Sequence, residues 1–160
     1  IMAYNYHHLY ELEIACLRFF TVYGPRQRPE MAIHKFCRMI CNGETIPVYN
    51  HGNCLRDYTY VDDIVQGIVA ILDAKTLTYD VVNLGESQTI STLELIKILE
   101  QECGKKAILN LMESQQGDVE QTFADISHAK SVYGYKPQYP IQKGIKEFVK
   151  WYNDEHLTTL

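Results

Sequence analysis

Residues 56–63, RDYTYVDD, combine side chains that could bind an anion or act as acid and base. The single guanidinium, on Arg56, presents a planar set of N–H donors that suits a phosphate. An ordinary ion pair from Arg56 to Asp57 or another neighbour is the alternative. Asp62 and Asp63 could form an acid–base pair, but the better explanation is helix N-terminal charge, because acidic residues are common in a first helical turn.

A second candidate is the loop TVYGPRQRP at residues 21–29, which follows the apolar run Ile14–Phe20. Such a run is typical of a buried strand, and open α/β sheets bind ligands at the loops that follow their strands. The loop carries the hydroxyl of Thr21 and the guanidiniums of Arg26 and Arg28. Pro29 suits the first turn of a helix, whose free N–H groups would favour an anion.

The spacing of apolar residues predicts the elements that must position these groups. The helix after the arginine run has an apolar stripe at Val61, Ile64, Val65, Ile68, Ile71 and Leu72. Ser91 and Glu94 form a capping box for another helix, which Gly104 ends. The other predicted helices cover residues 2–9, 29–42, 127–134 and 141–152, and the predicted strands cover residues 14–20, 46–49, 81–85 and 107–111.

Composition limits the class of protein. The 160 residues are 46% hydrophobic, enough for one globular core, and contain no apolar stretch of about 18 residues that could cross a bilayer. We therefore expect a soluble protein with no membrane partner. The net charge of −5 makes nucleic acid an unsuitable partner, so any anion must be met by local arginines.

The five cysteines show neither a Cys-x-x-Cys pair nor a zinc-type spacing. We interpret them as reduced thiols of a cytoplasmic protein and expect no metal site. Cys37 and Cys41 share a predicted helical face with His34, an arrangement that is more often packing than metal binding.

Alternating strands and helices predict an α/β fold, although the clear strands are too few for a complete doubly wound sheet. The sequence contains no Gly-x-Gly-x-x-Gly turn and no P-loop. It is therefore either a small α/β binding domain or the second half of a larger protein.

Three ordered blocks carry a family resemblance: residues 17–29, residues 56–63, and Gly117–Val119 with Ala124–Ser127. Together they resemble the C-terminal half of the extended short-chain dehydrogenase/reductase family, in its branch of NAD-dependent nucleotide-sugar epimerases and dehydratases. The resemblance implies an NAD(P)-binding Rossmann-type α/β protein. Residues 1–160 would be a C-terminal fragment, with the nucleotide-sugar domain and the last Rossmann strands but not the Gly-rich N-terminal half.

The reaction that the resemblance implies is oxidation of a sugar C4 hydroxyl by NAD, rotation of the 4-keto intermediate, and return of the hydride to the opposite face. It requires a Gly-rich pyrophosphate loop and a Tyr-x-x-x-Lys pair, and this chain has neither. We therefore expect no catalytic residue here and no activity from the fragment alone. The full-length enzyme is expected to be a homodimer, and the fragment could self-associate through strands 14–20 and 81–84.

The resemblance also assigns roles by position. Arg56 would clamp the diphosphate of a UDP-sugar, Asp118 would accept from the ribose, and Tyr49 would flank the uracil. Phe19 would line the nicotinamide pocket. The remaining substrate-binding positions are Met31 and Ala32 where a helix opens, Gln115 where many relatives have an arginine, and the pair Thr21 and Arg28.

Thr21 stands where enzymes for neutral sugars commonly have asparagine, and with Arg28 it resembles the uronate-acting members. A buried carboxylate must be paired, and this hydroxyl and guanidinium could pair it from one loop. The first expectation is C4 epimerisation of UDP-glucuronate, and the second is that of UDP-glucose. The alternative roles for the two residues are strand-end capping and a surface ion pair.

Other functions remain open at this point. A decarboxylase or 4,6-dehydratase of the same family is one, and a sugar-nucleotide binding module without redox chemistry is another. A dimerising domain is a further class, in which Ile145, Phe148 and Tyr152 would form an interface.

Overall fold

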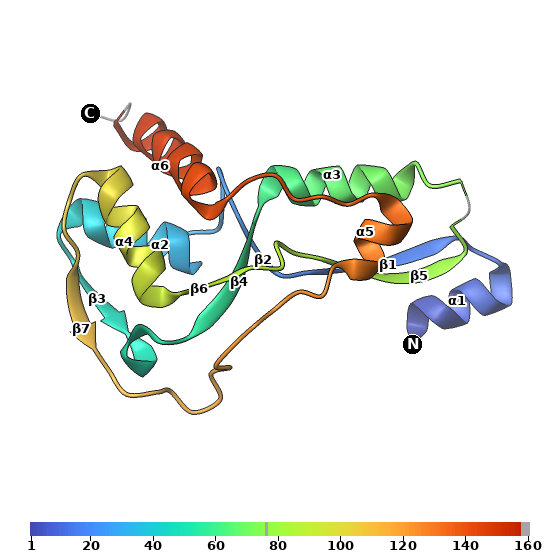
Figure 1. The fold of residues 1–160 in the computed structure, drawn as a ribbon, viewed down its shortest axis with the longest axis horizontal. Helices are drawn as coiled ribbons and strands as arrows, with labels where there is room; N and C mark the ends of the chain where they lie inside the picture. Colours follow the sequence, from blue (N-terminus) through green and yellow to red (C-terminus); the bar gives the residue numbers. More distant parts are fainter. Residues whose placement is uncertain (76, 158–160) are drawn as a thin grey trace.

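The computed structural model describes residues 1–75 and 77–157, which form two lobes joined by a small sheet (Figure 1). Within these residues, every helix is too short or too polar to cross a membrane. The elements in chain order are α1 (Met2–Tyr10), β1 (Ile14–Phe19), β2 (Thr21–Tyr23), α2 (Ala32–Asn42), β3 (Thr45–Val48), the 3₁₀ turn η1 (Tyr49–Gly52), β4 (Leu55–Tyr60), α3 (Val61–Leu72), β5 (Tyr79–Leu84), β6 (Thr89–Ser91), α4 (Thr92–Cys103), β7 (Ile108–Leu111), α5 (Ser127–Tyr133) and α6 (Ile141–Leu157).

The first lobe contains β1 and β5, which pair in parallel, together with α1, α3 and α5. Its core joins α3 and α5 to β5 through Ile64, Ile71, Val82, Leu84 and Ala129. The predicted strands 14–20 and 81–85 are confirmed, with small shifts at their ends. A parallel strand pair covered by helices is the arrangement that the sequence led us to expect for the Rossmann-type part of the chain.

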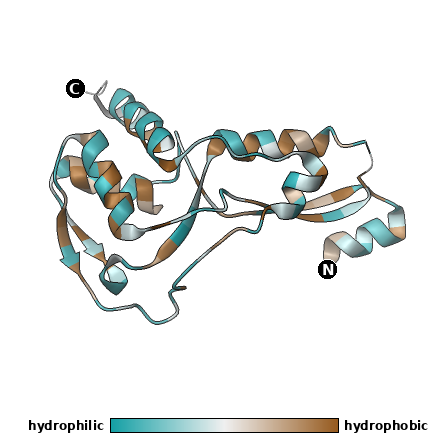
Figure 2. Cartoon of the chain, in the orientation of Figure 1, coloured by the Kyte–Doolittle hydropathy of each residue, from teal (hydrophilic) through white to brown (hydrophobic). Residues whose placement is uncertain are grey.

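The second lobe packs α2, α4 and α6 together beside the parallel pair β3–β7. Hydrophobic and hydrophilic segments alternate along α2 and α4, as expected of helices with one buried face (Figure 2). The capping box is confirmed, because Ser91 Oγ accepts from the Glu94 N–H at 3.2 Å while the Glu94 carboxylate accepts from the Ser91 N–H at 2.8 Å. Ile145, Phe148 and Tyr152 lie in this core, which is the wrong place for a dimer interface.

The joining sheet has the order β2–β4–β6 and was largely missed from the sequence. We predicted residues 56–60 only as a lead into a helix, but they belong to β4, which pairs with β2 on one side and with β6 on the other. A strand paired on both sides and buried on both faces shows no alternation of polar and apolar residues, so its pattern was not visible. The short strand β6 was also missed.

The apolar stripe of α3 is only partly buried. Ile64 and Ile71 face the core, but the side chains of Val65 and Leu72 are 50% and 76% exposed. The buried face is centred on Gly67 instead, where an added Cβ would lie 2.9 Å from the Leu84 and Tyr135 side chains. Glycine at this position therefore lets α3 approach β5 closely.

The helix expected to begin at Pro29 begins three residues later, at Ala32. Residues 24–31 instead form successive turns, in which the Gln27 N–H donates to Gly24 O and the Met31 N–H donates to Arg28 O, each at 3.1 Å. The predicted stop is confirmed, since Gly43 takes the left-handed conformation at the C-cap.

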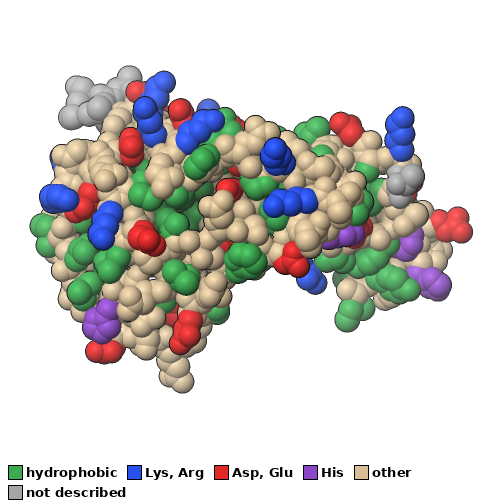
Figure 3. Space-filling model, in the orientation of Figure 1, with side chains coloured by type: hydrophobic (Ala, Val, Ile, Leu, Met, Phe, Trp, Pro, Cys, Tyr) green, Lys and Arg blue, Asp and Glu red, His purple; other side chains and the backbone are tan. Residues whose placement is uncertain are grey.

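The exposed apolar surface differs from our expectation. Val82 and Leu84 in β5 are completely buried, so these two side chains are not available for self-association. Several exposed large apolar side chains lie on α1, on the outer face of α3 and on β7, and Figure 3 shows hydrophobic side chains at the end of the molecule where α1 lies. The members of this set on the two helices are Met2, Tyr4, Tyr6, Leu9, Tyr10, Val65, Val69 and Leu72.

Candidate functional site

The main cleft of the described chain has a volume of about 960 Å³ and lies at the carboxyl ends of β1 and β2. Four of the predicted ligand residues line it: Phe19, Thr21, Arg28 and Met31. Ligands of open α/β sheets bind at this edge. The structure therefore places Phe19, the expected nicotinamide contact, in the same cleft as Thr21 and Arg28, the residues expected to bind a sugar carboxylate.

Two further arginines, Arg18 and Arg26, also line this cleft. Arg26 was noted in the loop but given no role, and Arg18 was missed because it lies inside an apolar run predicted as a buried strand. In fact Arg18 and the adjacent Phe19 are exposed at the end of β1, and the Phe19 side chain is 50% exposed. The cleft therefore has three guanidiniums available for an anionic ligand.

Backbone geometry fixes the loop that carries these arginines. Gly24 has φ of +146°, and a Cβ on it would lie 2.6 Å from Val61 Cγ1, so a side chain does not fit there. The Gln27 amide closes the loop by donating to Val22 O at 2.8 Å and accepting from the His34 N–H at 3.2 Å. Arg26 follows with φ of +65°, the left-handed conformation. The loop is thus anchored to both β2 and α2.

Arg28 is highly exposed, with 76% of its side chain open to solvent. Its Nε lies 3.3 Å from Glu30 Oε1, which is the surface ion pair that we weighed as an alternative role. Ion pairs this exposed contribute little free energy. The guanidinium can therefore exchange Glu30 for a ligand carboxylate at small cost.

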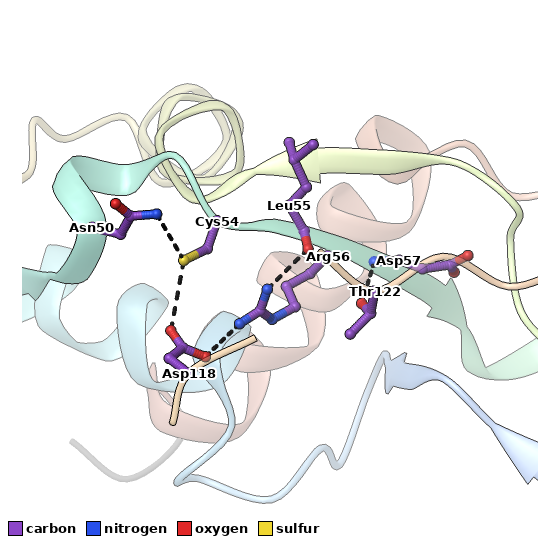
Figure 4. A network of polar contacts seen from close by, with 7 residues as sticks. All are labelled: Asn50, Cys54, Leu55, Arg56, Asp57, Asp118 and Thr122. Atoms are coloured by element: carbon purple, nitrogen blue, oxygen red, sulfur yellow. Dashed lines mark hydrogen bonds and ion pairs between the residues drawn. The ribbon is translucent and has the colours of Figure 1, made fainter. Parts of the chain in front are cut away.

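Arg56 lies in β4 and is directed at Asp118, with Arg56 Nη2 2.6 Å from Asp118 Oδ1 (Figure 4). The other Asp118 oxygen accepts from the Cys54 thiol at 3.6 Å. The alternative pair with Asp57 is wrong, because successive strand residues point to opposite faces and Asp57 points away (Figure 4). The ion pair that we weighed as an alternative role for Arg56 is thus present, with Asp118 as its partner, and the diphosphate role stays a prediction.

The predicted residues do not converge on one hollow. Arg56 lines a separate small pocket of about 120 Å³ with Tyr58 and Glu86, whereas Thr21 lines the main cleft. The two sites are nevertheless adjacent in the sheet, since Thr21 pairs with Tyr58 across β2 and β4. Thr122, from the segment after Asp118, lines the main cleft. A ligand that uses both sites must therefore be extended.

Three other predicted residues lie at the margins. Tyr49 begins η1 and is 38% exposed, so its ring is available for stacking. Gln115 is exposed, and its carbonyl accepts from the Asp118 N–H at 3.1 Å. Ala32 packs against the core at the start of α2 and presents no polar side chain.

The carboxylates near Arg56 have structural roles. Asp63 is buried and accepts from the N–H groups of Gln138 and Tyr139 at 2.9 and 3.0 Å, which ties the segment before α6 to α3. Asp62 is exposed in the first turn of α3. The interpretation of these acids as helix N-terminal charge, rather than as a catalytic pair, accords with these contacts.

Glu86 was not singled out from the sequence, yet its environment is unusual. Burial, with the nearby charges of Asp63 and Asp57, raises the pKa of Glu86 to about 7. Its Oε2 is buried and has no hydrogen-bond partner among the described residues. A carboxyl group in this position is more stable when protonated.

We expect Glu86→Gln to make stability less dependent on pH. As pH rises from about 4.5 towards 7, the unfolded state releases the Glu86 proton before the folded state does, so the folded protein loses stability in this window. The glutamine variant should therefore be more stable than wild type at pH 8 by about 1–2 kcal/mol, a figure reduced for partial exposure, and equal to it at pH 4.5. Urea unfolding at both pH values measures this, with exposed Glu102→Gln as the control. A constant difference at both pH values would contradict the assignment.

With this geometry in view, comparison with known proteins gives the family. The family model described as GDP-mannose 4,6 dehydratase matches residues 1–148. The chain belongs to this family. The resemblance to the nucleotide-sugar branch of the extended short-chain dehydrogenases/reductases, and the α/β Rossmann-type fold class, are thereby confirmed.

Two relatives of this chain are UDP-glucuronate 4-epimerases. The UDP-glucuronate 4-epimerase of Thermodesulfobacterium geofontis is 42% identical over 152 residues, which cover 94% of this chain and 46% of that protein. UDP-glucuronate 4-epimerase 2 of Arabidopsis thaliana is 41% identical over 167 residues, covering 94% of this chain and 38% of the relative. The chain therefore spans about half or less of the length of these relatives.

Solved structures of the family superpose closely. The UDP-glucuronic acid 4-epimerase of Bacillus cereus, in complex with UDP-glucuronic acid and NAD, has a TM-score of 0.90 at 35% identity over 96% of this chain and 49% of that one. The UDP-glucose 4-epimerase of Thermotoga maritima, with UDP-glucose, has a TM-score of 0.86 at 26% identity over 96% of this chain and 50% of that one.

Proposed function

We propose that this chain is the substrate-binding half of an NAD-dependent epimerase that inverts C4 of UDP-glucuronate. The observation that carries the proposal is the shared cleft of Thr21 and Arg28, to which Arg18 and Arg26 add two more guanidiniums. A hexuronate brings a carboxylate into the site, and that charge must be paired when it leaves water. A hydroxyl and an arginine on one anchored loop can pair it.

The extended arrangement of the two sites suits a nucleotide sugar. In the proposal, Arg56 holds the diphosphate, Asp118 accepts from the ribose and Tyr49 stacks on the uracil, while Met31 and the helix start at Ala32 border the phosphates and Gln115 borders the nucleotide. The sugar then extends towards Thr21 and Arg28. Anchoring at the diphosphate leaves the sugar ring free to turn about the bonds that join it to the phosphate, as an exchange of faces at C4 requires.

The cleft fits one end of a nicotinamide cofactor. The half-exposed ring of Phe19 and the side-chain-free surface at Gly24 lie where strands β1 and β2 end, which is where such folds bind nucleotides. No Gly-rich pyrophosphate loop is present in the sequence, so this chain would contact only the nicotinamide end. NAD, when bound, supplies the hydride acceptor and donor for the chemistry at C4.

We also infer that the intact protein is a homodimer. Large apolar side chains are exposed on α1 and on the outer face of α3, and monomers rarely leave large apolar patches open. Coverage of these two helices by the remaining part of the protein and by a second subunit accounts for their composition. The proposed partners are thus a UDP-sugar and a second copy.

The charge of Arg28 provides the test of substrate. In the intact enzyme, Arg28→Ala should lower kcat/KM for UDP-glucuronate roughly 10–150-fold, mainly through a higher KM. This corresponds to a loss of about 1.5–3 kcal/mol of transition-state stabilisation. Turnover of UDP-glucose, which has no carboxylate, should change little. Steady-state assays with both substrates measure the difference, and Arg38→Ala, an exposed arginine on α2 outside the cleft, is the matched control.

Other outcomes of this assay discriminate the alternatives. Equal losses on the two substrates would favour a UDP-glucose 4-epimerase, a function that the similarity to the Thermotoga maritima enzyme also supports. Release of CO₂ or water from the sugar would indicate a decarboxylase or dehydratase of the same family. Binding of either nucleotide sugar without turnover in the presence of NAD would indicate a binding module.

A further inference from the structure

Three cysteines from distant parts of the chain meet between α2 and α4. Cys37 and Cys41 lie one turn apart on α2, and Cys103 is the last residue of α4. Their three sulfur atoms all lie within 4.8 Å of one another, and Cys37 Sγ is 3.8 Å from Cys103 Sγ. The two helices run side by side in the second lobe, so the cluster is a junction between them (Figure 1).

The spacing of the sulfur atoms suits a shared cation. A Zn–S bond is about 2.3 Å long, so two sulfurs of a tetrahedral site are separated by about 3.8 Å. Thiolates select soft cations such as Zn²⁺ and Cu⁺ over Mg²⁺ or Ca²⁺. We propose that Cys37, Cys41 and Cys103 form a three-thiolate site for a thiophilic d¹⁰ cation, a site separate from the nucleotide-sugar cleft.

Access to the cluster is possible from one side. Cys37 is fully buried, whereas Cys41 and Cys103 are partly exposed. A cation can therefore enter past Cys41 and Cys103 and be held from beneath by Cys37. The three sulfurs leave one position for water in a four-coordinate site, or complete a trigonal one.

The charge of the complex is offset locally. Binding of a divalent cation by three thiols releases three protons and leaves one net negative charge. Lys105 lies beside the site, with its Nζ donating to the Cys41 carbonyl at 2.6 Å.

From the sequence we expected no metal site, and we interpreted the group of His34, Cys37 and Cys41 as packing. His34 shares the α2 face with Cys37, but its Nδ1 lies 2.7 Å from the Gln27 carbonyl, which ties it to the loop at the cleft. The third sulfur comes instead from a residue 66 positions after Cys37. No spacing rule reaches that far, so only the packing of α4 on α2 reveals the cluster.

The test uses Cd²⁺ as the probe, added to the reduced, metal-free intact protein that carries this chain. Thiolate-to-Cd²⁺ charge-transfer absorption should rise with added Cd²⁺ and saturate at equimolar metal. Cys103→Ser should weaken Cd²⁺ binding by more than about 100-fold, because loss of even an outer-shell partner costs 10–100-fold. Cys16→Ser, in β1 far from the cluster, should bind Cd²⁺ as wild type does.

Measurements of folding and of Cd²⁺ affinity in a second cluster variant separate loss of the site from loss of the fold. Cys41→Ser, at a partly exposed position, should fold as wild type by circular dichroism and still lose high-affinity Cd²⁺ binding. The proposal is overturned if wild type gives no charge-transfer band, or if the cluster variants and Cys16→Ser bind Cd²⁺ equally. A wild-type protein that binds no Cd²⁺ but oxidises to a Cys37–Cys103 disulfide would also overturn it and would identify the cluster as a redox pair.

Discussion

Replacement of Asp57 by asparagine is expected to lower the free energy of unfolding by about 3–5 kcal/mol. Asp57 is completely buried, and its carboxylate accepts from the N–H groups of Glu86, Ser87 and Ala124 at 2.9–3.0 Å. Thr59 also donates to it at 3.3 Å. One side chain thus joins β4, the turn after β5 and the segment that leads to α5.

Asparagine preserves the shape of this side chain but not its bonding. Its carbonyl oxygen can replace Oδ1, which receives the Glu86 and Thr59 donors. Its NH₂ group would face the Ser87 and Ala124 N–H groups, so two buried donors would lose their acceptor. Each unsatisfied buried donor costs about 1–3 kcal/mol.

Urea denaturation of the intact protein measures this effect. Asp62→Asn is the matched control, because Asp62 is an exposed acid in the same segment and its change should alter stability by less than about 0.5 kcal/mol. Similar losses in the two variants would mean that net charge, and not the Asp57 hydrogen bonds, determines the result. No loss in Asp57→Asn would show that the three backbone donors are satisfied in another way.

Arg56→Ala is expected to weaken binding of UDP by about 2–4 kcal/mol, roughly 30–1,000-fold. The side chain of Arg56 is only 20% exposed, so a diphosphate that meets it is shielded from bulk water. Its Nη2 donates to Asp118 and its Nη1 donates to the Leu55 carbonyl at 3.0 Å, which orients the guanidinium in advance. A guanidinium that is already oriented loses less side-chain entropy for each hydrogen bond that it forms with a phosphate.

Calorimetry with UDP and with uridine isolates this contribution. Uridine lacks both phosphates, so its weaker affinity should be the same in wild type and in Arg56→Ala. Arg56→Lys keeps the charge but loses the planar fork, and it should recover only part of the UDP affinity. Unchanged UDP affinity in Arg56→Ala, or equal losses for UDP and uridine, would remove the diphosphate role.

Local sequence patterns determined the elements that have a clear period or a clear terminus. The capping box of Ser91 and Glu94, the Gly43 and Gly104 ends, and the last helix are all where the sequence places them. Each depends on residues a few positions apart, so the chain path does not affect it. The order of the three sequence blocks likewise sufficed to indicate the family.

Strand β4 shows where local patterns fail. It is buried on both faces and paired on both sides, so neither alternation nor a polar edge marks it in the sequence. Arg18 was missed for a related reason, since an arginine within an apolar run gives no indication that the strand ends beside a cleft. The stripe of α3 was misjudged because apolar spacing does not show which part of a wide stripe is buried: Val65 and Leu72 are exposed, and the buried face is centred on Gly67.

The sequence by itself determined the family, most of the helices and the residue types that can meet a nucleotide sugar. Only the tertiary structure decided which of them share a space: Arg56 with Asp118, 62 residues away, and Cys37 with Cys103, 66 residues away. The same packing separated the Arg56 pocket from the Thr21 cleft. Side-chain periodicity records which face of an element is buried, but the partner of that face is set by how whole helices and strands pack, and no local spacing encodes it.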